Sequence, residues 1–111
     1  MDKHYHLIGI GGIGMSGIAQ LLLRSGLRVS GSDLKENKIT RELTMLGAEI
    51  FIGHNAANVR GAGLIVYSSA IKEDNSEVIE AKRLGIPVIK RAQALASMML
   101  DKSVITVTGS H

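Results

Sequence analysis

The chain has 111 residues, a formal net charge of +3 and 45% hydrophobic residues, and it contains no cysteine. This length allows one compact domain, and the composition differs from that of disordered segments. The lack of cysteine excludes disulfides, thiolate metal sites and a cysteine nucleophile. Glycines interrupt the first apolar run, and Lys and Arg are spread along the chain. We therefore expect a cytoplasmic protein with no membrane segment and no nucleic-acid partner.

Strand-like runs alternate with helical runs, and this alternation predicts parallel strands that are joined by crossover helices. The expected strands are residues 5–10, 27–30 with an extension to 33, 49–52, 64–67 in the middle of the sheet, 88–89 and 104–108. The expected helices are residues 14–25, a segment around 39–46, residues 74 or 75 to 84, and a segment around 92–99. The sequence thus predicts an α/β, Rossmann-like three-layer domain with a mostly parallel sheet.

A glycine pattern lies between the first expected strand and the first expected helix. Gly9, Gly11 and Gly14 satisfy G-x-G-x-x-G, and Asp33 ends the second strand. Glycines let the backbone approach a diphosphate, and the helix that follows directs free N–H groups at the anion. The pattern favours nucleotide binding, and close packing of helix and strand is the alternative. We expect Gly11→Val to abolish binding and keep the fold, because its side chain would occupy the place of phosphate oxygens.

Two polar loops are expected at the same edge of the sheet, beyond the carboxyl ends of the strands, where ligands of open α/β sheets bind. They are Gly53, His54 and Asn55 after the third strand, and Ser68, Ser69 and Ala70 after the fourth. These side chains suit a base or a ribose; alternatively, the serines cap turns and His54 is a solvated loop residue. No metal-ligand spacing and no catalytic constellation is visible. We therefore expect these residues to bind rather than to react.

Several segments, taken in order, resemble the N-terminal domain of the Mur ligases. They are residues 8–19 (IGIGGIGMSGIA), 31–33 (GSD), 53–54 (GH), 68–75 (SSAIKEDN) and 107–111 (VTGSH). Within that family, the glycine loop is most similar to that of the members that add L-alanine to UDP-N-acetylmuramate, rather than to that of the ligase that recycles murein tripeptide. The resemblance extends over nearly the whole chain.

The resemblance implies a three-domain cytoplasmic enzyme of peptidoglycan synthesis, the pathway of cell wall biogenesis. Such a ligase would bind UDP-N-acetylmuramate in its N-terminal domain, ATP with Mg²⁺ in a central P-loop domain, and L-alanine with help from the C-terminal domain. It would form an amide through an acyl phosphate. Residues 1–102 would then be the domain that binds UDP-N-acetylmuramate, and residues 103–111 would be the first strand of a truncated ATP-binding domain.

The resemblance also implies roles for individual residues. The UDP diphosphate would lie against Gly11, Gly12, Ile13 and Gly14, with Met15 and Ser16 opening the helix behind it. The uridine side would involve Asp33, His54, Ser68, Ser69 and Ala70. The start of a P-loop would be Gly109, Ser110 and His111, and the Gly-Lys-Thr of the motif does not follow.

We therefore expect the chain alone to bind the sugar nucleotide without catalysing and without a cofactor of its own, whereas its full-length parent would be the ATP-dependent ligase. Two alternatives share the glycine pattern. One is the NAD-binding domain of an oxidoreductase, and the other is a nucleotide-sensing module that dimerises. Formation of a homodimer stays open.

Overall fold

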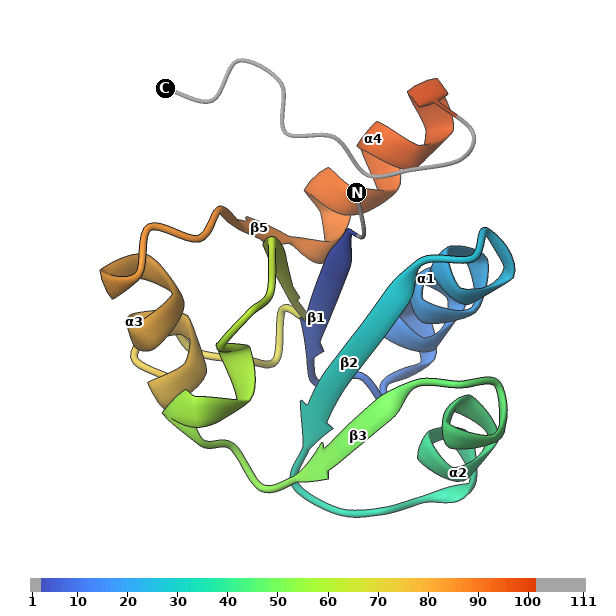
Figure 1. The fold of residues 1–111 in the computed structure, drawn as a ribbon, viewed down its shortest axis with the longest axis horizontal. Helices are drawn as coiled ribbons and strands as arrows, with labels where there is room; N and C mark the ends of the chain where they lie inside the picture. The colour runs from blue at the N-terminus through green and yellow to red at the C-terminus, as the bar shows by residue number, and fades with distance from the viewer. Residues whose placement is uncertain (1–2, 102–111) are drawn as a thin grey trace.

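A five-stranded sheet forms the middle layer of this computed structural model, which describes residues 3–101 (Figure 1). The strands are β1 (His4–Ile8), β2 (Arg28–Asp33), β3 (Glu49–Ile52), β4 (Leu64–Tyr67) and β5 (Val88–Lys90). They pair in the order β3-β2-β1-β4-β5, and every pair is parallel. The predicted α/β fold with a parallel sheet is confirmed. The strand expected at 104–108 lies outside the described residues.

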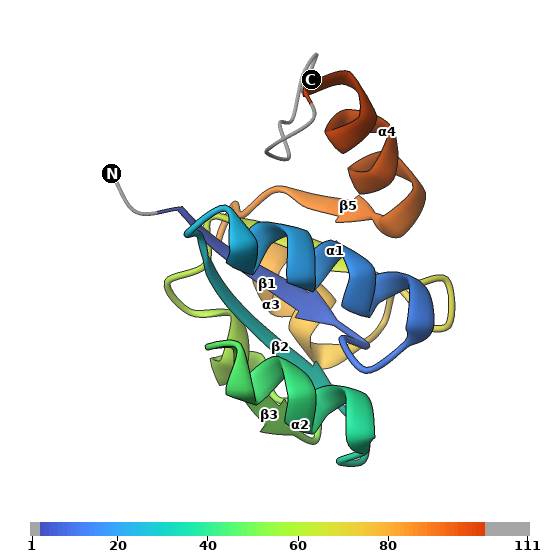
Figure 2. The same cartoon turned by 90° about the vertical axis from the view of Figure 1, so that its right-hand side faces the viewer.

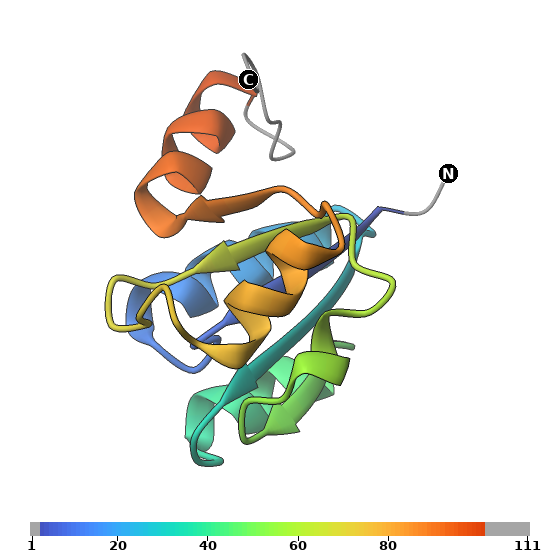
Figure 3. The same ribbon diagram turned by 90° about the vertical axis from the view of Figure 1, so that its left-hand side faces the viewer.

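Helices cover both faces of the sheet and complete the three predicted layers. They are α1 (Ile13–Arg24), α2 (Lys38–Met45), α3 (Ser76–Arg83), α4 (Arg91–Asp101) and the 3₁₀ helix η1 (Ala56–Val59). Figure 2 shows α1 and α2 in front of the sheet, and Figure 3 shows α3 in front of the opposite face. Ala94 and Met98 of α4 join the core on the side of α1. Within residues 3–101, no helix is long and apolar enough to cross a bilayer.

The strand β1 occupies the middle of the sheet, and its side chains alternate between the two faces. Tyr5 and Leu7 belong to the larger apolar core under α1, whereas Ile8 belongs to a smaller core that includes Val78 of α3. All five residues of β1 are buried. The four residues of β4, the strand expected in the middle, are also buried, one position away. Both strands therefore carry the side chains that hold the two helical layers.

The predicted and observed elements differ mainly at their ends. The first strand ends at Ile8 rather than at Ile10, because Gly9 adopts a positive φ of 82° and turns the chain out of the sheet. Ile10 instead folds back and packs, fully buried, against Gly31 of β2. The segment expected as a loop contains η1, which begins where the Asn55 side chain accepts a hydrogen bond from the backbone N–H of Ala57. The glycine turn is thus built into the core.

We expect Gly31→Ala to destabilise the domain by about 1–3 kcal/mol, the usual effect of overpacking. An added Cβ would lie 2.5 Å from Cδ1 of Ile10 and 2.7 Å from the carbonyl oxygen of Leu7. Gly17→Ala is the matched control, because no neighbour lies within 4 Å of its added Cβ. It should stabilise α1 by about 0.5–1 kcal/mol. Urea unfolding followed by circular dichroism measures both, and equal stability of the two variants would contradict this packing.

Candidate functional site

The glycine loop after β1 is anchored to the end of β2 by its own backbone. The N–H groups of Gly9 and Ile10 donate to the carbonyl oxygen of Ser32 at 2.8 and 3.1 Å, and the N–H of Gly12 donates to Gly9 at 3.1 Å. The N–H groups of these three residues are therefore satisfied by acceptors within the protein. The helix α1 begins directly after them, at Ile13.

The amino end of α1 presents three N–H groups that have no acceptor among residues 3–101. They belong to Ile13, Gly14 and Met15, whereas the N–H of Ser16 already bonds to Gly12 at 2.9 Å. Gly12 is the N-cap and supplies no side-chain cap. Gly12, Ile13 and Gly14 are exposed, with the Ile13 side chain at 87%, and Met15 and Ser16 are buried behind them. Such a helix end attracts an anion.

Asp33 holds the glycine loop rather than standing free at the edge of the sheet. Its Oδ2 accepts the N–H of Gly11 and its Oδ1 accepts the N–H of Leu34, both at 2.8 Å. A Cβ on Gly11 would lie 2.8 Å from that Oδ2 and 3.0 Å from Cγ2 of Thr40. The reason given for the Gly11→Val prediction is therefore wrong. The new side chain would collide with Asp33 and α2, not with a bound phosphate, so the variant would disturb the loop itself.

Arg91, the first residue of α4, covers the exposed side of the glycine loop. A Cβ on Gly14 would lie 3.0 Å from both Cδ and Nη1 of Arg91. Within residues 3–101, this guanidinium has no carboxylate partner. Sequence reasoning missed Arg91 because it took the lysines and arginines together as charges spread along the chain. The position of Arg91 directly after a strand is the signal that would have found it. A cation and three free N–H groups thus share one edge of the sheet.

The loop after β4 lies at the same edge. A Cβ on Gly9 would lie 3.0 Å from Oγ of Ser68, so this hydroxyl is next to the glycine loop. Ser69 lines an open cavity of about 410 Å³ together with Lys72, Lys90 and three other side chains. Ala70 is exposed in the turn that follows. Of these three predicted residues, the structure brings Ser68 closest to the glycine loop.

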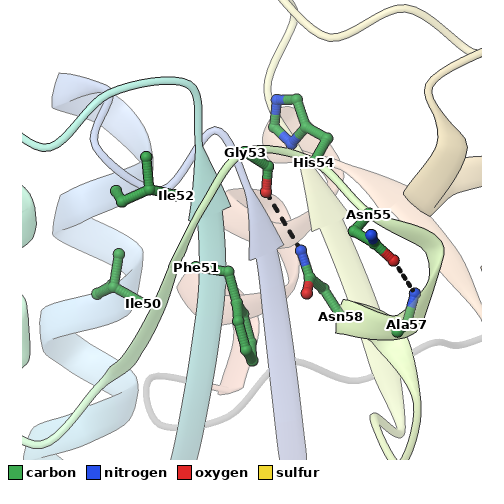
Figure 4. Close-up of a pocket in the computed structure, with 8 residues that line it drawn as sticks. All are labelled: Ile50, Phe51, Ile52, Gly53, His54, Asn55, Ala57 and Asn58. Atoms are coloured by element: carbon green, nitrogen blue, oxygen red, sulfur yellow. Dashed lines mark hydrogen bonds between the residues drawn. The ribbon is translucent and has the colours of Figure 1, made fainter.

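The loop after β3 lines a second open cavity, of about 530 Å³, at the β3 edge of the sheet (Figure 4). The backbone N–H of Gly53 donates to the carbonyl oxygen of Asp33 at 2.7 Å, which places the loop beside the end of β2. Asn58 closes the loop by donating to the carbonyl oxygen of Gly53 at 3.3 Å. The His54 side chain is 14% exposed and lies 2.9 Å from Oγ of Ser32. His54 is therefore fixed within the protein, not a solvated loop residue.

A buried carboxylate, that of Glu77 in the first turn of α3, ties this loop to the sheet. Its Oε1 accepts from Nε2 of His6 at 2.6 Å and from the Ser32 hydroxyl at 2.8 Å. Its Oε2 accepts from the backbone N–H of Asn55 and from Nδ2 of Asn58, both at 3.0 Å. The Glu77 side chain is fully buried. Donors from β1, β2 and the loop after β3 thus meet at one carboxylate.

The hydrogen bonds also assign the protons along the buried row His4, Ser30 and His6. Nδ1 of His4 faces the carbonyl oxygen of Gly61 at 3.3 Å and must carry a proton. Burial lowers the pKa of His4, so its ring is neutral, and its Nε2 accepts the Ser30 hydroxyl proton at 2.7 Å. Oγ of Ser30 then accepts from Nδ1 of His6 at 2.7 Å. Nε2 of His6 lies 2.6 Å from Oε1 of Glu77, so His6 links this row to the buried carboxylate.

Sequence reasoning missed this network because each member looks ordinary by itself. His4 and His6 on β1, and Ser30 and Ser32 on β2, each lie two residues apart and face α3. Two polar pairs with that spacing, on strands that are otherwise apolar, indicate a polar network on one face of the sheet. Their partner is 71 residues from His6 in the sequence. Spacing alone therefore finds the polar stripe and not the carboxylate.

The Glu77 network predicts a specific dependence of stability on pH. Burial alone would raise the pKa of this carboxyl, but hydrogen bonds from His6 and Asn58, the charge of His6 and the Ser32 hydroxyl hold the pKa at about 2, below the ordinary 4.5. The ionised form therefore stabilises the fold above about pH 4.5, and this contribution is lost as the pH falls toward 2.

We expect Glu77→Gln to lower the free energy of unfolding by about 3 kcal/mol at pH 6, and the deficit to shrink as the pH falls from 4.5 toward 2. Urea unfolding at pH 6, 4, 3 and 2 measures it. Glu36→Gln is the control, because this exposed carboxylate lies 3.8 Å from Arg41 and should keep the wild-type profile. A deficit of Glu77→Gln that stays constant over this range would contradict the assignment of an ionised, hydrogen-bonded Glu77.

Comparison with known sequences gives consistent relatives over nearly the whole chain. The UDP-N-acetylmuramate–L-alanine ligases of Aquifex aeolicus and Persephonella marina are 57% and 54% identical to it over 109 residues. These alignments cover 98% of this chain and 24% of each relative. The chain therefore spans about a quarter of the length of the curated relatives it matches.

Solved structures of related ligases share the fold. The UDP-N-acetylmuramate–alanine ligase of Thermotoga maritima has a TM-score of 0.82 at 33% identity, over 89% of this chain and 23% of its own. The UDP-N-acetylmuramate:L-alanyl-γ-D-glutamyl-meso-diaminopimelate ligase of Neisseria meningitides has a TM-score of 0.81 at 33% sequence identity. This match covers 91% of this chain and 32% of the ligase chain. A nucleoside-diphosphate-sugar epimerase of Pseudomonas aeruginosa, at 18% identity and a TM-score of 0.63, shares the fold alone. Because the model of the Mur ligase family, catalytic domain, matches residues 4–103, the chain belongs to the Mur ligase family.

Proposed function

We propose that the chain is the UDP-N-acetylmuramate-binding domain of a ligase that joins L-alanine to this sugar nucleotide. The observation that carries the proposal is the amino end of α1, where three N–H groups are free and Arg91 covers Gly14. Relatives more than half identical to the chain are named for this reaction. The identity of the ligand comes from those names, and its place comes from the chemistry of the edge.

A diphosphate suits this edge of the sheet. The N–H groups of Ile13, Gly14 and Met15 would donate to its oxygens, and the helix end adds about 0.3–2 kcal/mol toward an anion. The guanidinium of Arg91 would supply hydrogen bonds to a charged group, each contributing about 1.5–3 kcal/mol. Gly11 and Gly12 would shape the loop without donating to the ligand, because their N–H groups bond within the protein. Ser16 would support the helix from behind.

The uridine side of the ligand would lie along the ends of β2, β3 and β4. Asp33 keeps free lone pairs beside its two backbone bonds, and it is partly exposed. His54 follows β3 and Ser68 follows β4, so both are near strand ends at this edge. Ser69 and Ala70 come next in the same turn and complete the proposed contacts.

The whole protein would catalyse ATP-dependent amide formation in the cytoplasm, with ATP and Mg²⁺ bound beyond the domain described above. Residues 1–102 would form the sugar-nucleotide domain, and residues 103–111, which include Gly109, Ser110 and His111, would open the ATP-binding domain. The last ten residues lie outside the described part of the structure.

Calorimetric titration of the chain with UDP-N-acetylmuramate, UDP and NAD tests the proposed function. We expect both uridine nucleotides to bind, and we expect NAD to give no heat beyond dilution. In two-dimensional NMR spectra, the amide signals of Ile13 and Gly14 should shift most on addition of UDP. A tight NAD complex without any response to UDP-N-acetylmuramate would overturn the proposal in favour of an oxidoreductase domain.

We expect Arg91→Ala to weaken UDP binding about ten- to a hundredfold, the loss that corresponds to one charge-assisted hydrogen bond. Arg24→Ala is the matched control, because Arg24 lies in the last turn of α1, at the end opposite the glycine loop, and should bind UDP like the wild type. Titrations at equal ionic strength measure both variants. Equal affinities of the two variants would remove Arg91 from the proposed diphosphate site.

A further inference from the structure

The loop that carries His54 has few apolar anchors and depends on one buried carboxylate for its position. Within residues 53–58, the side chains of Asn55 and Ala57 are exposed and none is fully buried. Glu77 accepts hydrogen bonds from the backbone of Asn55 and the side chain of Asn58, both at 3.0 Å. The carboxylate reaches the loop from α3, across the face of the sheet, so α3 determines where the loop stands.

The same carboxylate determines which nitrogen of His54 carries the proton. An ionised Glu77 has no proton to donate, so the Ser32 hydroxyl must donate to its Oε1 at 2.8 Å. Oγ of Ser32 then has only lone pairs to offer Nδ1 of His54, 2.9 Å away. Oε2 of Glu77 also lies 3.4 Å from Nδ1. In a neutral His54 ring the proton is therefore on Nδ1, and Nε2, which has no partner among residues 3–101, is an acceptor.

We infer that Glu77 is a positioning residue for the nucleotide site: through Ser32 and the loop after β3 it holds His54 with Nε2 as a hydrogen-bond acceptor for an O–H or N–H group of the nucleoside. This inference rests on the proposed function for the identity of the ligand. The assignment of the proton does not, since it follows from the hydrogen bonds within the protein. A residue that only stabilised the fold would not need to set the proton of a ring at the sheet edge.

The variant Glu77→Gln is predicted to move the ring proton of His54 from Nδ1 to Nε2. The two donors of the loop, the Asn55 N–H and Asn58 Nδ2, require the amide oxygen of the new side chain at their end. The NH₂ group then faces both Ser32 and Nε2 of His6, which must accept from it. The Ser32 hydroxyl in turn directs its own proton to Nδ1 of His54. The ring proton moves to Nε2, which becomes a donor. An acceptor for the ligand is thus replaced by a donor without a change in side-chain size.

Nitrogen-15 NMR of the histidine rings at pH 8, where an ordinary imidazole is neutral, reads this proton directly. In the wild type we expect His54 as the Nδ1–H tautomer, and in Glu77→Gln as the Nε2–H tautomer. A wild-type ring protonated on Nε2 overturns the inference without any variant, so the test survives even if Glu77→Gln does not fold. An unchanged Nδ1–H tautomer in folded Glu77→Gln overturns it as well.

Titration with UDP-N-acetylmuramate then measures the consequence for binding. We expect Glu77→Gln to weaken affinity about ten- to a hundredfold, the effect of removing groups that orient metal-ligating histidines. Glu80→Gln is the matched control on the same helix, because Glu80 pairs with Arg83 at 2.7 Å, and the sugar nucleotide should bind it like the wild type. Equal affinities of both variants and the wild type overturn the positioning role. If the wild type binds no sugar nucleotide, the proposed function fails, while the ring spectrum still decides what Glu77 does.

Discussion

The burial of one ionised carboxylate determines how α3 and the loop after β3 pack on the sheet. An unpaired charge in a protein interior is strongly unfavourable, so Glu77 has to be surrounded by donors. Those donors come from β1, β2 and the loop after β3, and the helix that carries Glu77 packs beside η1. The carboxylate therefore fixes the distance between α3 and the sheet, and the polar half of that face needs no large apolar core. His6 on β1, with Nε2 2.6 Å away, is the nearest of these partners.

On the other face of the sheet, under α1, small residues rather than buried charges allow the close packing. Gly31 lets Ile10 fold under the glycine loop, and Gly11 lets the loop approach Asp33 within hydrogen-bond distance. Both contacts are internal, so these positions shape the loop while its later residues face outward. The two halves of the candidate site thus have different physical supports: close packing holds the glycine loop, and a hydrogen-bonded carboxylate holds the loop with His54.

The order and type of the described elements followed from local patterns. Apolar runs, helical spacing and glycine stops predicted each strand and each α-helix but not the 3₁₀ helix η1, and β4 matched residue for residue. The glycine loop and the edge that it shares with Ser68 were also predictable. Arg91 and Glu77 were not, because their roles depend on partners that only the fold brings near: Arg91 meets Gly14 across the sheet edge, and Glu77 meets His6 across one sheet face. The proton on each histidine needs the complete set of hydrogen bonds.

The helix α1 begins without a side-chain cap and therefore lacks the stability that a capping residue would add. Gly12 has an ordinary φ of −72°, so its backbone would accept any side chain, and yet the residue that usually caps a helix is absent. Serine or aspartate at such a position typically adds about 1 kcal/mol to a helix by occupying its first N–H groups. An intramolecular cap and an external anion compete for the same donors. The first N–H groups of α1 therefore stay open to an acceptor from outside residues 3–101, and a capping side chain at position 12 would stabilise the helix while occupying the donors of the proposed site.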